Sequence, residues 1–279
     1  MTASTLVVGA SGAVGSALLR GLGARGAATI AWSRRRREGE GATWERRELF
    51  ADTLPQVESI FSAGPIDGLV TALSRSTLCR PRRVVALSSS SATFKRDSAD
   101  PNERKLAERL ATSEASLARH CRSTGALCVI LRPTLIYGGD DVAHFGAVVA
   151  HAQRLGFVVL PRDARGMRMP IHADDLAATM LNALDNFEAD GVFAVGGGET
   201  LAYDLMLERV LRSRGLPARL LRVPGVMFRV ALGGAHRVGA LRGLTPAIVA
   251  RMGADLVVDD ADARRVLRHA PGPFRPGQP

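Results

Sequence analysis

The segment TLVVGASGAVGSALL, residues 5–19, joins a short apolar run to a helical pattern through a turn that holds Gly9, Gly12 and Gly15. The apolar run predicts a buried strand, and the spacing after the turn predicts a helix over residues 13–24. One glycine tolerates positive φ, a second lets a pyrophosphate approach the backbone, and a third lets helix and strand pack closely. Free amides at the helix start favour an anion. The segment therefore predicts a dinucleotide-binding turn, with a purely structural turn as the alternative.

The same alternation of short apolar runs and amphipathic segments continues through the first half of the chain. Such alternation predicts the doubly wound α/β class, a parallel sheet covered by helices on both faces. The expected strands are residues 5–8, 29–32, 68–72, 83–87 and 127–131. The expected helices are residues 13–24, 54–62 and 102–124.

Prolines punctuate shorter elements after Pro133, which predicts a smaller C-terminal lobe. We expect a dinucleotide-binding domain over residues 1–165 and a smaller substrate lobe over residues 166–279. Within that lobe, residues 192–214 are expected to return to the main sheet. The tail PGPFRPGQP is expected to be irregular.

Composition narrows the class of protein. The 279 residues are 46% hydrophobic and carry 37 basic and 27 acidic side chains, for a net charge of +10. These values are typical of a soluble globular protein and exclude disorder, collagen and a membrane-spanning bundle. The arginines are scattered outside Arg34–Arg37 and do not form a basic helix or a strand with interleaved aromatics, so we expect no nucleic-acid partner. A basic surface also suits phosphorylated small molecules or an anionic membrane face.

The cysteines indicate a reducing compartment. Cys79, Cys121 and Cys128 show no paired spacing, so we expect three small buried residues and neither a metal site nor a disulfide framework. The N-terminus runs straight into the first expected strand without a basic leader. We therefore expect a cytoplasmic protein.

The end of the second expected strand reads IAWSRRRREG, residues 30–39. Sites that take NAD usually carry an acidic residue here for the ribose hydroxyls. Ser33, Arg34 and Arg35 stand there instead, and an arginine can make charge-assisted hydrogen bonds to a 2′-phosphate. We predict NADP in preference to NAD, with a solvated basic loop as the alternative.

Five motifs together resemble the extended and atypical short-chain dehydrogenase/reductase superfamily, the group of NAD-dependent epimerases and dehydratases. They are GASGAVG at 9–15, LSSSSATF at 87–94, LRPTLIYG at 131–138, RMPIHADDLA at 168–177 and VGGGETLAYDL at 195–205. The resemblance spans nearly the whole chain and implies an NAD(P)-binding Rossmann fold. With the glycine turn and the arginines, it implies that the cofactor contacts are Gly9, Ser11, Gly12, Ala13, Val14, Gly15, Ser33, Arg34, Arg35, Ala72, Ser88, Pro133 and Thr134.

In that superfamily a serine or threonine after the fifth strand, and a tyrosine and lysine one helix later, carry the proton and hydride chemistry. Ser88–Ser91 match the serine, and we favour Ser90 as catalytic. The alternative is a polar strand end with local hydrogen bonds. The tyrosine and lysine of the motif are missing, because Leu106 and Leu110 stand at those positions. We interpret this helix face as apolar packing and Lys105 as a surface residue.

The only two tyrosines, Tyr137 and Tyr203, lie beyond that helix. The resemblance places Tyr137, with Pro133 and Thr134, beside the nicotinamide end of the site. Tyr137 is therefore our candidate for the catalytic acid, against the alternative of an aromatic plug in the core. A missing general acid typically costs a factor of about 10² to 10⁴ in rate.

Two further residues are candidates for substrate binding. Arg168 resembles an arginine that contacts the phosphate of nucleotide sugars, and it forms with Arg162 and Arg165 either an anion clamp or a charged loop. His172 can donate a proton near neutral pH or be a satisfied residue between the lobes. In the following helix we expect Asp174 or Asp175 to cap the N-terminus.

Residues 223–244 form an apolar segment that is interrupted by arginines. Arginines and glycines argue against a membrane span, which leaves surface attachment, a lid over a lipid-like substrate, or core packing. We favour packing or a lid.

Three functions remain open. The first is an NADP-dependent oxidoreductase or epimerase-like enzyme with a non-standard active site, acting on a small hydroxyl- or carbonyl-bearing metabolite or a nucleotide sugar. The second is a non-catalytic NADP(H)-binding sensor or scaffold, which the leucines at 106 and 110 favour. The third is redox-independent chemistry on the same fold.

Overall fold

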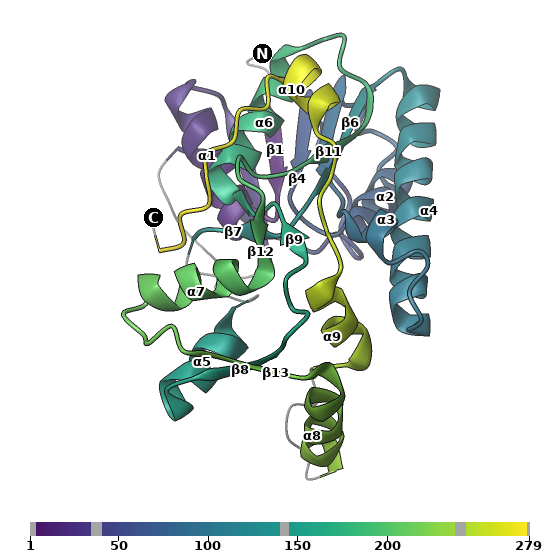
Figure 1. Ribbon diagram of the computed structural model, residues 1–279. Coiled ribbons are helices and arrows are strands. Elements are labelled where there is room, and N and C mark those ends of the chain that lie inside the picture. The colour runs from purple at the N-terminus through teal and green to yellow at the C-terminus, as the bar shows by residue number, and fades with distance from the viewer. Residues whose placement is uncertain (1–3, 35–40, 140–144, 238–243, 278–279) are drawn as a thin grey trace.

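The computed structural model describes residues 4–34, 41–139, 145–237 and 244–277. Its centre is a seven-stranded parallel sheet with the strand order β11-β6-β5-β4-β1-β2-β3 (Figure 1). The strands are β1 (Thr5–Val8), β2 (Thr29–Ser33), β3 (Thr43–Arg46), β4 (Ser59–Ser62), β5 (Arg83–Leu87), β6 (Leu127–Pro133) and β11 (Gly191–Val195). The order reverses between β1 and β4, so the connections from these two strands leave in opposite directions and open a crevice at their carboxyl ends.

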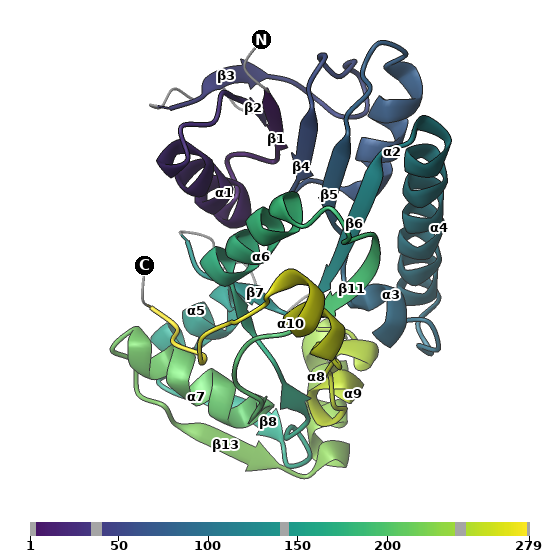
Figure 2. The ribbon, with the colours of Figure 1, turned by 90° about the horizontal axis from the view of Figure 1, so that it is seen from above.

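Helices cover both faces of this sheet (Figure 2). One face packs against α1 (Ala13–Ala24), α6 (Ala173–Asp185) and α10 (Ala261–Leu267). The other face packs against α2 (Ile66–Arg75) and α4 (Pro101–Thr124), and the short α3 (Ser91–Phe94) precedes α4. Alternate residues of the inner strands β1, β4, β5 and β6 enter the two cores, as a sheet buried on both faces requires. The predicted doubly wound α/β class is confirmed.

The local signals at α4 explain why the sequence predicts its bounds well. Asp100 accepts a hydrogen bond from the Asn102 amide at 2.9 Å, and Pro101 occupies the first turn. Gly125 ends the helix with a φ of 74°. A side-chain cap, an N-terminal proline and a left-handed glycine are strong local helix boundaries.

Two sequence predictions exchanged strand and helix. Residues 54–62 were expected to be a helix, yet Ser59–Ser62 form the central strand β4. Residues 68–72 were expected to be a strand, yet they lie inside α2. Leu54 and Val57 are loop residues that are buried in the core, and they stand at helical spacing from the strand residues. Together these apolar positions gave the sequence a helical period. The GLVTA run is too short for its period to be read by itself.

A smaller lobe is built from short elements. They are β7 (Ile136–Tyr137), α5 (Gly146–Leu155), β8 (Val158–Pro161), β9 (Met167–Arg168), β10 (Ile171–His172), β12 (Leu201–Ala202), α7 (Tyr203–Ser213), β13 (Leu220–Val223), α8 (Gly225–Arg237) and α9 (Pro246–Gly253). β7 pairs with β10, β9 with β12 and β8 with β13. β11 pairs with β6 at the edge of the main sheet. The described part of the tail after α10 is irregular, as predicted.

The three cysteines are buried and free, which confirms their interpretation as small core residues. Across the described ranges we find no helix with the length and apolar character needed to cross a membrane. The described residues also contain no group of three or more His, Cys, Asp or Glu side chains that could hold a metal ion.

Candidate functional site

The glycine turn lies where β1 ends and α1 begins, beside the carboxyl end of β4. Gly9 has a φ of +73°, and the Gly12 amide donates to the Gly9 carbonyl at 3.0 Å. Gly12 is the N-cap of α1, and no side chain caps this helix. The first-turn amides of an α-helix have no intrahelical acceptors. The turn therefore offers amide donors and a partial positive charge to an anion.

The three glycines are required for different reasons. A Cβ on Gly9 would lie 2.9 Å from the Ala63 carbonyl carbon, and one on Gly15 would lie 2.2 Å from the Gly9 carbonyl oxygen. Both contacts are too short, so packing within the protein itself explains these two glycines. Gly12 has a φ of −81°, which any residue can adopt. Among the described residues, a Cβ on Gly12 would contact only the Gly9 carbonyl oxygen, at an ordinary distance of 3.5 Å. Neither strain nor packing requires glycine at this position.

The second strand ends at Ser33, whose side chain is buried. Its hydroxyl donates to the Ser11 hydroxyl at 3.0 Å, which ties β2 to the glycine turn. Arg34 is exposed at the strand end, and Arg35 lies outside the described residues. Arg46 pairs in register with Ser33 from β3 and is also exposed. Sequence reasoning missed Arg46 because β3 was not expected, although adjacent arginines at 46 and 47 are a visible signal.

The structure corrects the position of Ala72. It lies in α2 and is fully buried against the core, so it cannot line the crevice. The residues that do follow β4 are Ala63 and Gly64, and the Ala63 amide donates to the Val8 carbonyl at 2.9 Å. The Ser62 hydroxyl at the same strand end is buried and has no hydrogen-bond partner among the described residues. A buried hydroxyl without a partner is costly.

Ser88 belongs to a buried ion pair. Its hydroxyl donates to Glu114 of α4, and the same carboxylate accepts hydrogen bonds from the guanidinium of Arg132 on β6. Glu114 is 4% exposed, and its hydrogen bond raises the pKa of Arg132.

One turn earlier in α4, Leu110 packs against the second core, and Lys105 is exposed. The helix face that would carry the tyrosine and lysine of the motif is apolar at Leu110, as predicted.

Ser90 has a different environment from Ser88. Its amide donates to the Pro133 carbonyl at 3.0 Å, which holds the serine loop beside the end of β6. Its hydroxyl has no hydrogen-bond partner among the described residues and lines a cavity of about 420 Å³. The walls of this cavity are α3, β11, Arg132 and the chain at 257–259. Among Ser88–Ser91, Ser90 is thus the serine that lines this cavity.

Pro133 and Thr134 continue from β6 toward β11. The Thr134 amide donates to the Val195 carbonyl at 3.0 Å, and its hydroxyl donates to the Met169 carbonyl. Gly139, five residues on, lies against α1, because a Cβ there would be 2.9 Å from the Ala13 Cβ. The loop after β6 thus closes over the start of α1 and borders the crevice.

The Tyr137 hydroxyl is engaged with the C-terminal tail. It donates to the Pro273 carbonyl at 3.3 Å and accepts from the Arg275 amide at 3.1 Å. Its ring meets those of His172 and Phe274 edge-on, at centroid distances of 5.0 and 4.7 Å. Burial raises the pKa of Tyr137. In this arrangement the tyrosine holds the tail, and contact with a substrate would require the tail to leave.

His172 caps α6, a role that we expected of an aspartate. Its Nδ1 accepts from the Asp174 amide at 3.2 Å. Asp174 instead pairs with Arg20 of α1 at 2.5 Å, and Asp175 accepts from the Gly272 amide at 3.0 Å. An imidazole nitrogen therefore occupies the acceptor position that a carboxylate usually takes. The two carboxylates are left to fasten α6 to α1 and to the tail.

Arg168 is buried and faces the backbone. Its guanidinium donates to the carbonyls of Met167, Ala254 and Arg251 at 2.9, 2.7 and 2.5 Å. The Tyr203 ring lies 5.1 Å from the guanidinium carbon. Burial lowers the pKa of Arg168. The side chain therefore anchors the end of α9 rather than opening toward a phosphate.

The other two arginines of the expected clamp do not join Arg168. Arg165 lies 3.5 Å from Asp204, and Arg162 is exposed. The structure therefore does not bring the three guanidinium groups together.

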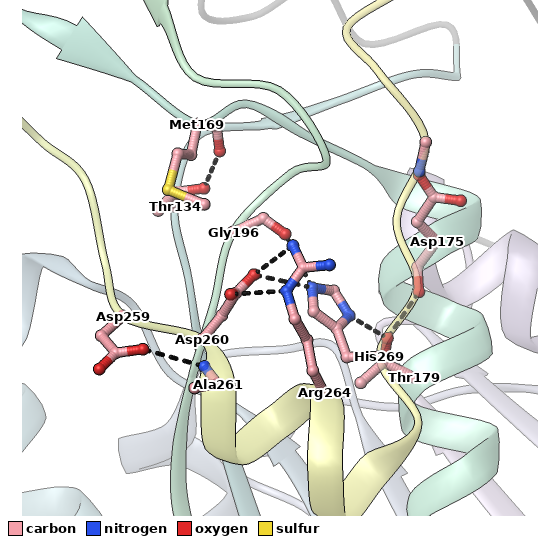
Figure 3. A network of polar contacts seen from close by, with 11 residues as sticks. Thr134, Met169, Asp175, Thr179, Gly196, Asp259, Asp260, Ala261, Arg264 and His269 are labelled. Atoms are coloured by element: carbon pink, nitrogen blue, oxygen red, sulfur yellow. Dashed lines mark hydrogen bonds and ion pairs between the residues drawn. The ribbon is translucent and has the colours of Figure 1, made fainter.

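A polar network holds the tail against the sheet (Figure 3). His269 lies between the Thr179 hydroxyl, 2.7 Å from Nδ1, and the Gly196 carbonyl, 2.8 Å from Nε2. Asp260 accepts two hydrogen bonds from Arg264, at 2.8 and 2.9 Å, and lies 3.7 Å from His269 Nε2. Burial lowers the pKa of His269. Sequence reasoning missed this residue, because its partners come from distant segments.

Comparisons with known proteins identify the class of fold. No family model and no curated protein sequence matches the chain. Among solved structures, UDP-glucose 4-epimerase from Thermotoga maritima, with UDP-glucose, is 16% identical with a TM-score of 0.70, over 96% of this chain and 93% of that one. A short-chain dehydrogenase/reductase superfamily protein from Agrobacterium tumefaciens, with bound NAD, is 17% identical with a TM-score of 0.70, over 97% and 93%.

An NAD-dependent NDP-hexosamine 5,6-dehydratase gives a TM-score of 0.72 at 15% identity, over 98% of this chain and 93% of that one. The chain therefore shares its fold with these proteins along nearly its whole length. The resemblance drawn from its motifs is confirmed at the level of the fold.

Proposed function

We propose that this chain binds a nicotinamide dinucleotide between the Gly9–Gly15 turn and the carboxyl end of β4. The observation that carries the proposal is Gly12, where nothing in the described structure requires glycine. A ligand that must approach the backbone does require it. The solved structures of similar fold support the choice of ligand, since one contains NAD and another is NAD-dependent.

The residues at the crevice fit such a ligand. The helix start from Gly12 to Gly15 would hold the pyrophosphate, and Ser62 has a buried hydroxyl without a described partner. At the end of β2, Arg34 is exposed, and Arg46 on β3 is in register with the preceding residue, Ser33. We propose that these two guanidinium groups favour the 2′-phosphate and hence NADP, although the neighbours named above are NAD proteins.

We further propose that the protein is an oxidoreductase or epimerase-like enzyme acting on a small hydroxyl- or carbonyl-bearing metabolite or a nucleotide sugar. A bound nicotinamide supplies hydride transfer. The chain itself contributes the Ser90 hydroxyl, which faces a cavity and is free to hold a substrate oxygen. The bound UDP-glucose of the Thermotoga epimerase supports the nucleotide-sugar class.

A second candidate is a non-catalytic nucleotide-binding module. Leu110, which the resemblance places at the lysine of the superfamily motif, packs against the core, and the Tyr137 hydroxyl is occupied by the tail. In this candidate no side chain donates a proton to a substrate. Bound NADP(H) instead sets the position of the C-terminal lobe for a partner. This candidate explains both observations without an unidentified acid.

Steady-state turnover with NADPH and a panel of nucleotide sugars and small carbonyl compounds separates the two candidates. Ser90→Ala should lose at least 100-fold in kcat with unchanged nucleotide affinity, a loss on the order of a missing catalytic donor. Ser89→Ala is the matched control, because its hydroxyl accepts the Ser91 amide within the loop. Nucleotide binding without consumption of NADPH would favour the module. Equal rates for Ser90→Ala and the wild type would reject the role of Ser90.

A further inference from the structure

The helix α8 carries an apolar stripe that no described element covers. Val226, Met227 and Val230 are 64%, 61% and 72% exposed, whereas Phe228 and Leu232 on the opposite side are buried. Val226 and Val230 stand one turn apart and so share one face of the helix. α8 lies at the end of the molecule away from the start of α1 (Figure 1). The side of α8 with Phe228 and Leu232 therefore packs, as expected, and the side with Val226 and Val230 is left uncovered by the described residues.

Arginines predominate around this stripe, although Asp163 lines the same pocket as Arg229. Residues 209–254 contain nine arginines and neither aspartate nor glutamate. Arg229 and Arg237 belong to α8, and Arg219 precedes it. In the parts of the chain that the structure describes, these three arginines form no ion pair with a carboxylate. Four of the nine arginines, Arg209, Arg212, Arg222 and Arg251, pair with carboxylates of other segments. The positive charge beside the exposed valines and methionine is therefore that of Arg229 and Arg237.

We propose that this surface, the α8 face, docks onto an anionic lipid bilayer. We define it by Val226, Met227, Val230, Arg229 and Arg237. An amphipathic helix that lies in the bilayer plane buries apolar side chains at the level of the acyl chains, while arginines contact the phosphates. Each basic side chain near an anionic surface strengthens partitioning by about five-fold. The 13 residues of α8 span about 20 Å, too short to cross the hydrocarbon core, so the contact is peripheral.

Charge favours lipid over a second copy of the chain. A two-fold symmetric dimer through the α8 face would place the same patch on both partners. The two guanidinium groups of one α8 face would then be brought close to the same two groups of its copy, which is repulsive. A bilayer with acidic headgroups offers dispersed negative charge and an apolar interior together, and both match this surface.

The direct test is co-sedimentation of the full chain with vesicles. Phosphatidylcholine vesicles that contain about one-third phosphatidylserine are compared with vesicles of phosphatidylcholine alone, at low and high salt. The apolar variant is Val226→Ser with Met227→Ser and Val230→Ser, and the charge variant is Arg229→Glu with Arg237→Glu. The matched control is Leu78→Ser with Arg80→Glu, because both residues are exposed in the loop before β5. Unchanged Tm and unchanged nucleotide binding show that each variant is folded.

The wild type is expected to bind the acidic vesicles and to leave them at high salt. Each α8 variant should bind at least ten-fold more weakly, and the control should bind like the wild type. Absence of wild-type binding at low salt, or equal loss in the control, would overturn the proposal. So would a wild-type dimer, measured by analytical ultracentrifugation, that the apolar substitutions convert to a monomer. This test does not depend on the proposed enzymatic function.

Discussion

Replacing Gly12 with aspartate is expected to abolish nucleotide binding and leave the fold as stable as before. Gly12 is the N-cap of α1, with an extended ψ of 170° and no side-chain cap. Aspartate is a preferred residue at this position and complements the helix dipole, so the free energy of unfolding should be unchanged or up to about 1 kcal/mol higher. The new Cβ would lie 3.5 Å from the Gly9 carbonyl oxygen, an ordinary contact.

The loss of affinity follows from charge. Two unit charges about 4 Å apart repel by about 4 kcal/mol at an effective dielectric constant of 20. Screening and side-chain rotation reduce this value, so we expect the Kd for NADPH to rise by at least about 30-fold, which is about 2 kcal/mol. Gly12→Asn is the matched variant with the same shape and a comparable cap but no charge. Its Kd should fall between those of the wild type and Gly12→Asp.

Gly15→Ala, in contrast, should lower the stability of the fold itself. Its Cβ would lie 2.2 Å from the Gly9 oxygen and 2.7 Å from the Ala10 Cα, both backbone atoms. The turn or the helix must shift, and such overpacking costs about 1–3 kcal/mol. Calorimetric titration with NADPH and thermal unfolding, each applied to all three variants, separate the two effects. Wild-type affinity in a folded Gly12→Asp protein would refute the reasoning, because the glycine would then have no ligand to accommodate.

Other substitutions test single contacts. Arg34→Ala should weaken NADPH binding by about ten-fold or more and leave NADH binding unchanged, because a charge-assisted hydrogen bond contributes about 1.5–3 kcal/mol. Equal effects on the two nucleotides in calorimetric titrations, or the same effect from Arg119→Ala at another exposed arginine, would contradict this role of Arg34. Tyr137→Phe should expose the tail to limited proteolysis, since both hydrogen bonds to the tail are lost; a lower rate with an unchanged cleavage pattern would instead indicate the catalytic role. Glu114→Ala should cost about 3 kcal/mol in urea unfolding, because it leaves a partly buried guanidinium unpaired; a cost below about 1 kcal/mol would contradict this. His269 binds a proton more weakly in the folded than in the unfolded chain, so the free energy of unfolding should fall as the pH drops below about 6.5, the ordinary pKa of the group. If the His269→Asn variant kept the same pH dependence of stability, His269 would not be its source.

The sequence predicted those parts of the fold whose signals are local. The glycine turn, α1 and α4 have caps, turns and periodicity within a few residues of each other. β4 and α2 were exchanged because a four-residue central strand has too few positions to show its period. The neighbouring Leu54 and Val57 are buried by tertiary contacts that the sequence does not display.

In the candidate site, too, the residues with local sequence signals were predicted and those placed by tertiary contacts were missed. Gly12 and Arg34 stand where the strand–turn–helix pattern predicts them. Ser62 was missed because β4 itself was missed. The engagement of Tyr137 by Pro273 and Arg275 depends on a tail that returns over more than one hundred residues, and no local pattern encodes such a contact.

The most direct measurement of the central claim is a calorimetric titration of the purified, nucleotide-stripped protein with NADPH and with NADH. We predict one site per chain, with NADPH bound at least ten-fold more tightly than NADH. Equal affinity for the two nucleotides would contradict the role of Arg34 and leave a dinucleotide site. Binding of neither nucleotide would contradict the claim itself and make the Gly9–Gly15 turn purely architectural.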